Sequence, residues 1–440
     1  MNKQYQNNLF DIFDEIMTAE IVIMNKSVVA LAADSAVTIR TPDAHAKVFH
    51  TANKIFTLSK FAPVGIMISD EAVIMDVPWE IIIKSYRNEL GKERFDTIEE
   101  YCNDFWRFVN EFSFEEEAER RYIDRIAYWV FQDLRNNLDA WVEKKLRQNA
   151  KIPVEETFVY LVSLIHSHAL QWKQESEDEG VHDHNTVAQL CDKYQNTLLG
   201  FAKSCFENYP LTEEIYAQLC YIVIHVANVG IRFSGIVIAG YGENEYYPQC
   251  RSFGVGGVIS KKTTIFKEQQ YAIQAGTRSS IIPFAQDDAV RTFIDGVSPY
   301  LAGFMEQHFG KFFVEHHGTL IDGLSEDDQQ KFKKLLSQIY QSAYKSGMEK
   351  FQQARIDKIL QATEYGNKDE LAKMAETLVH LESFGKQVVL DEETVGGPID
   401  VAVITKGDGF IWMKRKHYFP AELNHHFFRN YFLFNETEEE

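Results

Sequence analysis

Three residues that could act together in catalysis, Thr18, Asp34 and Lys54, lie at the ends of three apolar runs. A threonine hydroxyl is a weak nucleophile at neutral pH unless a base removes its proton, and a free α-amine on the same residue, with a pKa of about 8 or below, is a suitable base. A nearby ammonium group would lower the pKa of that amine, and a carboxylate would keep the ammonium charged. The three residues predict nucleophilic catalysis by Thr18, on condition that Thr18 becomes residue one of the mature chain.

Short apolar runs separated by turn-like segments predict the strands that would position these residues. The runs are Ile21–Met24, Val28–Ala33, Ile55–Leu58 and Val64–Ile68. In this arrangement Thr18 precedes the first strand, Asp34 follows the second and Lys54 precedes the third. Each residue alone is commonplace at a strand end, so the hypothesis depends on their joint spacing.

The spacing and its local sequence resemble the proteasome β-subunit and the related bacterial peptidase subunit, both N-terminal-nucleophile (Ntn) hydrolases. In that family a catalytic Thr opens the mature chain, an Asp follows sixteen positions later within the sequence AADS, and a Lys opens a later strand. Here Thr18 and Asp34 are sixteen positions apart, Asp34 stands in the same AADS sequence, and Lys54 opens Lys54-Ile55-Phe56. The strand-like segment Ile236–Gly242 also resembles the family, and the likeness covers roughly 18–75, 234–296 and 385–415.

The resemblance implies a role for further residues. Thr18, Asp34 and Lys54 would be catalytic, and the backbone N–H of Ser69 would stabilise the oxyanion, although the family has Gly there and Asp70 follows. Other positions would support the nucleophile or shape an apolar specificity pocket. The supporting positions are Glu392, Thr394 and Gly276, and the pocket positions are Val37, Ala52 and Met67.

The order of strands, helices, strands, helices and strands predicts an α+β fold, a four-layer αββα Ntn-hydrolase sandwich of two antiparallel sheets. Residues 18–440 would form this one domain after an extension over 1–17. Apolar residues at helical spacing predict a helical insertion at about 112–232 and additional helices at about 297–383, which would enlarge the helical layers. A helix from about Ser279 to Gly296 and a closing hairpin from Gly396 to Met413 are also expected.

Composition limits the class of protein. The 440 residues carry a net charge of -20, which argues against nucleic acid and an anionic membrane as partners. No apolar run approaches the roughly 18 residues needed to cross a bilayer. Five cysteines without close CxxC spacing fit free thiols in a reducing, cytoplasmic compartment. No cofactor is expected, and no metal site either, because His182 and His184 beside Asp183 lack a third ligand group.

The start of the chain leaves two routes to a free Thr18. Residues 1–17 could be a propeptide removed by self-cleavage, or Met17 could be the true start, with an aminopeptidase exposing Thr18. If neither occurs, the α-amine of Thr18 stays blocked.

The sequence therefore predicts a proteasome-like threonine peptidase or amidohydrolase acting on peptide or protein substrates. The resemblance also implies assembly into a homo-oligomer, either a ring or an open assembly, and an ATP-dependent unfoldase as a partner. The alternative is a non-catalytic Ntn-fold scaffold that keeps its extension and binds a partner through the helical insertion.

Overall fold

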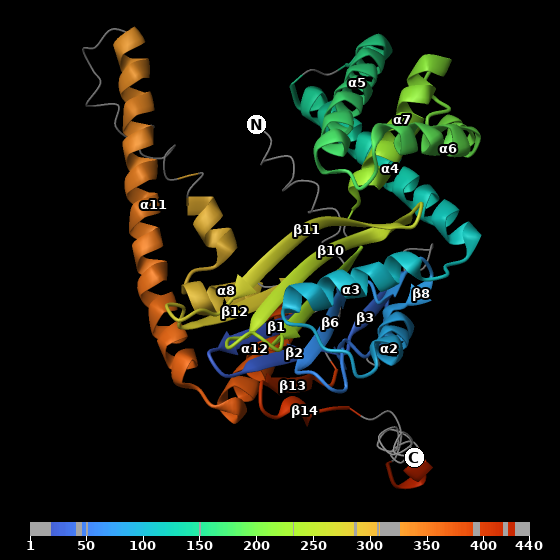
Figure 1. Cartoon of the computed structure of the whole chain (residues 1–440). Helices are drawn as coiled ribbons and strands as arrows, with labels where there is room; N and C mark the ends of the chain where they lie inside the picture. The colour runs from blue at the N-terminus through green and yellow to red at the C-terminus, as the bar shows by residue number, and fades with distance from the viewer. Residues whose placement is uncertain are drawn as a thin grey trace. The chain divides into compact units, whose positions relative to one another are not determined.

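The computed structural model describes residues 19–40, 46–49, 52–148, 151–231, 233–285, 288–305, 308, 326–389, 397–416 and 421–426. These residues form a mixed α/β protein with antiparallel sheets. The chain divides into two compact units, one comprising 1–55, 246–248 and 272–440, the other 56–245 and 249–271. Figure 1 shows the elements of both.

The first unit contains a five-stranded sheet in the order β12-β1-β2-β13-β14. Every neighbouring pair in it is antiparallel. Its strands are β1 (Ala19–Asn25), β2 (Val29–Ala33), β12 (Ser279–Ala285), β13 (Asp400–Thr405) and β14 (Gly409–Lys414). The apolar runs predicted as the first two strands and the closing hairpin are thus confirmed.

Helices cover one face of this sheet. The side chains of Ile21, Ala30 and Val401 pack against α8 (Asp288–Asp295) and α12 (Lys368–Val389). Because side chains alternate along a strand, Glu20, Val22 and Leu31 point to the opposite face, and they are also buried. The 40-residue helix α11 (Glu326–Tyr365) precedes α12 and stands out in orange in Figure 1.

The second unit contains a five-stranded sheet in the order β11-β10-β9-β6-β5. Its strands are β5 (Ile55–Thr57), β6 (Val64–Asp70), β9 (Ser234–Gly240), β10 (Gln249–Ile259) and β11 (Lys262–Ala272). Helices α2 (Trp79–Leu90) and α3 (Ile98–Glu111) cover one face, where aromatic side chains including Trp79 and Phe105 share one buried core with Ile66 and Ile68. Met67 and Ser69 therefore lie on the other face.

Four helices form most of the range 112–232. They are α4 (Glu116–Gln148), α5 (Val154–Glu179), α6 (His184–Cys205) and α7 (Glu213–Val229). The other three pack around α7, and Figure 1 shows the group at one end of the β10–β11 hairpin. Hydrogen bonds join the group to the hairpin; for example, the Ser260 N–H donates to Glu119, and the His182 ring bonds the carbonyl of Ile259 at 2.8 Å.

Short elements complete the described chain. They are β3 (Val37–Arg40) paired with β4 (Ala46–Phe49), β7 (Val73–Ile74) paired with β8 (Val77–Pro78), a helical stretch at 299–305, and a 3-10 turn at Ala421–Leu423. No helix among the described residues is long and apolar enough to span a membrane. All five cysteines are free thiols.

The prediction of a helix from Ser279 to Gly296 is wrong for the first half of that range. Ser279–Ala285 is strand β12, which pairs antiparallel with β1 from Asn25 to Ala19, and helix α8 starts only at Asp288. Pro283 explains the error: a proline disrupts the interior of a helix but is tolerated on an edge strand, which β12 is.

Candidate functional site

Lys54 lies at the centre of a buried cluster of charges in the first unit. Its side chain is only 2% exposed, and its Nζ lies 2.5 Å from Asp34 Oδ1 and 3.0 Å from Glu20 Oε1. Both carboxylates are themselves fully buried. Two of the three predicted catalytic residues, Asp34 and Lys54, are therefore in direct contact, and Glu20 is a third member that sequence reasoning missed.

The ends of the strands position this cluster. Asp34 follows β2, and its backbone N–H donates to the carbonyl of Ala19 at 3.1 Å. The N–H of Ala19 in turn donates to Asp34 Oδ1 at 3.4 Å. Lys54 directly precedes β5, and the neighbouring Ala52 donates its N–H to the carbonyl of Ser35. The carboxylate of Asp34 is thus held at the first residue of β1.

Electrostatics keep Lys54 protonated. Burial alone would lower the pKa of the Lys54 ammonium, but the charges of Asp34 and Glu20 outweigh it and raise the pKa above its ordinary value. At neutral pH Lys54 is therefore a fixed positive charge. It can orient and stabilise a neighbouring negative charge, but it cannot act as a general base.

Glu20 did leave a signal in the sequence. It is the one charged residue in β1, whose sequence AEIVIMN is otherwise apolar except for its last residue. A carboxylate inside a fully buried strand is costly unless an opposite charge accompanies it, so its presence indicates a buried partner. The register places Glu20 opposite Ala33 of β2 and Phe284 of β12.

A second buried ion pair lies on the same row of the sheet. Asp400 of β13 is opposite Ala33 on the side away from Glu20. Its carboxylate accepts hydrogen bonds from Lys416 Nζ at 2.6 Å and from the Lys416 N–H at 2.8 Å. Two lysine–carboxylate sites therefore lie two strands apart on one face of this sheet.

The predicted oxyanion donor belongs to the second unit. Ser69 is buried near the end of β6, opposite Gly235 of β9. It is not among the residues with positive φ, whereas the next residue, Asp70, has a φ of 60°. Serine at this position therefore has an ordinary backbone conformation, and the left-handed conformation occurs at the aspartate that follows.

Gly276 does not lie near the charge cluster, contrary to the prediction that it supports the nucleophile. Its turn precedes β12, and Ser279 at the start of β12 pairs with Asn25 at the far end of β1. Since a strand rises about 3.3 Å per residue, that end of β1 is about 20 Å from Ala19. The hydroxyl of Ser279 instead donates to the carbonyl of Leu360 at 2.8 Å.

Three predicted residues, Thr18, Glu392 and Thr394, lie outside the described residues. Of the pocket positions, the backbone of Val37 belongs to β3, Ala52 is half-buried in the first unit, and Met67 is fully buried on β6 in the second.

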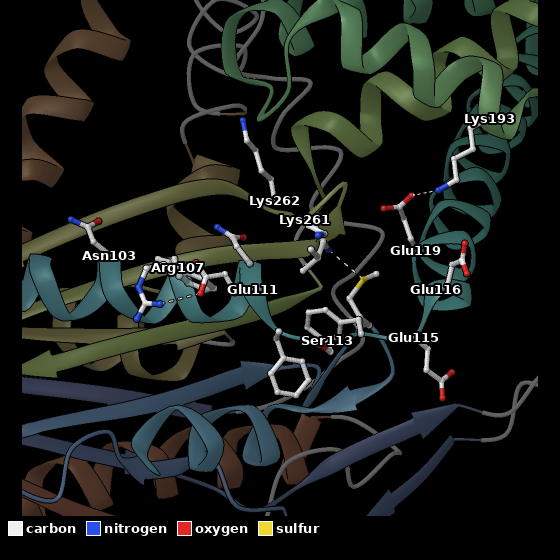
Figure 2. A pocket seen from close by; sticks show the side chains of 16 residues that line it. Asn103, Arg107, Glu111, Ser113, Glu115, Glu116, Glu119, Lys193, Lys261 and Lys262 are labelled. Carbon is white, nitrogen blue, oxygen red and sulfur yellow. Dashed lines mark hydrogen bonds and ion pairs between the residues drawn. The ribbon is translucent and has the colours of Figure 1, made fainter. Parts of the chain in front are cut away.

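A cavity of about 950 Å³ opens in the second unit, and no predicted site residue is among the residues that line it. Figure 2 shows it between the end of α3, the start of α4 and the β10–β11 turn. Many of the charges around it are paired: Glu119 accepts hydrogen bonds from Lys193 and Tyr194, and Arg107 pairs with Glu111. The first two of these contacts join α4 to α6, and the third lies within α3.

A comparison with known sequences adds no relative: no protein-family model and no curated protein matches the chain.

Proposed function

We propose that this protein is a threonine-type peptidase or amide hydrolase of the proteasome-like kind, with a freed Thr18 as nucleophile and base. The observation that carries the proposal is the buried contact between Lys54 and Asp34 at the first residue of β1. A lysine held charged beside the head of a strand is the electrostatic support that an N-terminal hydroxyl and amine require.

Covalent geometry supports the proposal. Thr18 is bonded to Ala19, and the backbone nitrogens of neighbouring residues lie less than about 4 Å apart. Because the N–H of Ala19 lies 3.4 Å from Asp34 Oδ1, a freed α-amine on Thr18 would lie at most about 7 Å from that oxygen in any conformation.

The reaction would proceed in two steps. The Thr18 α-amine accepts the hydroxyl proton while Oγ attacks the carbonyl carbon of the scissile amide, and the N–H of Ser69 donates to the resulting oxyanion. The protonated amine then gives the proton to the leaving nitrogen, which breaks the C–N bond and leaves an ester on Thr18. Water hydrolyses the ester with the same amine as base and restores the hydroxyl.

We further propose that the two sheets form the central layers of a four-layer αββα sandwich. Each sheet has one face covered by helices and a second face with buried apolar residues, such as Val22 and Leu31 in the first unit and Met67 in the second. Peptide or protein substrates, homo-oligomer formation and an ATP-dependent unfoldase are parts of the same proposal and depend on the resemblance.

Labelling with a threonine-directed epoxyketone tests the function, because the probe forms a ring with both the hydroxyl and the free amine. We expect intact-mass spectrometry to show one probe per chain, none on Thr18→Ala, and normal labelling of Lys84→Met, which breaks an exposed ion pair with Glu80. A correctly processed chain that begins at Thr18 and takes no label would refute the proposal.

A non-catalytic scaffold remains a second candidate because of Glu20. A second carboxylate on Lys54 offsets the positive charge that should lower the pKa of the α-amine. In a scaffold the cluster would only stabilise the first sheet. Retention of residues 1–17 in the natively expressed protein, together with absence of label, would favour this candidate.

A further inference from the structure

We propose that Glu20 is a positioning residue of this site, which holds Lys54 charged and in place. Its own negative charge also shifts the activity of Thr18 to a higher pH than the same site would have without that charge. The proposal rests on the proposed function, because the group whose working pH changes is the Thr18 α-amine. Nothing in the resemblance assigns a role to this position.

The position of Glu20 differs from that of a carboxylate that only stabilises the fold. Its side chain is fully buried on the second residue of β1, and its Oε1 lies 3.0 Å from Lys54 Nζ. Asp34 contacts the same ammonium from β2. The two carboxylates and one lysine carry a formal charge of -1, so the cluster favours a further positive charge. An α-ammonium on Thr18 would supply that charge.

Two other carboxylates near β1, among the described residues, have partners of their own. The neighbouring strand β12 has no titratable residue. On the helical face, the Glu382 carboxylate of α12 accepts hydrogen bonds from the N–H groups of Ala289 and Val290. On the face of Glu20, Asp400 is bonded to Lys416 and lies two strands away, about 10 Å. Within the part of the chain that the structure describes, Glu20 and Asp34 are the carboxylates that act on Lys54 directly.

The test compares Glu20→Gln with two matched variants. Glu20→Asp keeps the charge, and Asp400→Asn removes a buried carboxylate from the same row of the sheet without touching Lys54. We expect the pH midpoint of epoxyketone labelling to fall by about one pH unit in Glu20→Gln. The midpoint should remain close to that of the wild type in Glu20→Asp and in Asp400→Asn. Equal midpoints in Glu20→Gln and the wild type would overturn the proposal.

A second readout does not depend on catalysis. Because the pKa of Lys54 is raised in the folded protein, the stabilisation by Glu20 is complete below pH 10.5, the ordinary value, and decreases as the folded protein loses the Lys54 proton. Glu20→Gln should therefore unfold at a lower temperature than the wild type at pH 8, with a difference that narrows above pH 10.5. A difference independent of pH would contradict the role of Glu20. Absence of label in all variants would refute the proposed function, and this second readout alone would then decide the role of Glu20.

Discussion

At the scale of single residues, Lys54 is the buried cation that pairs with two buried carboxylates, Asp34 and Glu20. Replacement by Met keeps much of the volume of the side chain but removes the ammonium that Asp34 and Glu20 both contact in the buried cluster. Such a change typically costs about 3–5 kcal/mol. We expect Lys54→Met to lower the free energy of unfolding by that amount at pH 7, measured by chemical denaturation, and to abolish epoxyketone labelling.

The matched control for this prediction is Lys84→Met. Lys84 pairs with Glu80 on the surface of α2 and is half exposed, so its loss should cost less than about 0.5 kcal/mol. If Lys54→Met were as stable as this control, the cluster around Lys54 would have no role in the stability of the fold.

Asp70 provides a residue-scale test of the proposed oxyanion donor. Asparagine tolerates the left-handed conformation of this residue, so Asp70→Asn removes the negative charge beside Ser69 and keeps the backbone. Since a negative charge near the developing oxyanion opposes its formation, we expect the labelling rate to rise about threefold. Asp76→Asn is the control, because Asp76 also has a positive φ but is paired with Arg121 on the surface. An unchanged or lower rate in Asp70→Asn would argue against Ser69 as the donor.

Part of this site could be predicted from the sequence, because short apolar runs determine the strands that position two of its residues. Asp34 and Lys54 lie next to short apolar runs, and each run forms the expected strand. Glu20 and Asp400 were missed because the sequence does not show the register of the strands, which places Glu20 in β1 and Asp400 at the start of β13 on opposite sides of Ala33. Gly276 was placed wrongly because sequence spacing does not show at which end of β1 its turn lies.

At the scale of elements, the strands β1, β2 and β6 were predictable from their continuous apolar runs. Strand β12 was not, since SSIIPFA has no clear period and depends on its pairing with β1. Helix α7 shows that the buried residues of a helix are also hard to predict from the sequence. Every residue from Ile222 to Val229 is buried, including His225 and Asn228, so burial there does not follow polarity.

His225 makes the stability of α7 sensitive to acid. Burial, with Lys173 and His184 nearby, lowers the pKa of its ring to about 4, and both ring nitrogens lack hydrogen-bond partners. The unfolded chain takes up the proton from about pH 6.5 downward, before the folded protein does. Stability should therefore be lost as the pH falls from 6.5 to 4, by about 2 kcal/mol.

Replacement of this histidine by Phe should remove that loss. We expect the free energy of unfolding of His225→Phe to depend less on pH than that of the wild type between pH 6.5 and 4, as measured by urea denaturation. His166→Phe, at an exposed position of α5, should retain the dependence of the wild type. Identical pH dependence in His225→Phe and the wild type would show that another group is responsible.

At the scale of the whole molecule, the candidate site needs both ends of the sequence. Strand β2 pairs with β1 on one side and with β13 on the other, and β13 begins at Asp400. The strands beside Asp34 therefore come together only after nearly the whole chain has been made. If Thr18 is freed by self-cleavage, that step requires the assembled sheet, whereas removal of Met17 by an aminopeptidase does not.

This difference leads to a prediction about the mature protein. We expect the natively expressed chain to begin at Thr18, as determined by intact-mass measurement and N-terminal sequencing. Under self-cleavage Thr18→Ala should retain residues 1–17, because the cut needs the hydroxyl, and Lys54→Met should be processed slowly. Under the aminopeptidase route Thr18→Ala and the wild type should both begin at residue 18, because alanine and threonine are both small enough to follow a removed methionine. A mature chain that begins before residue 18 would leave the α-amine of Thr18 blocked, and one that begins after it would lack Thr18. In either case Thr18 could be neither nucleophile nor base.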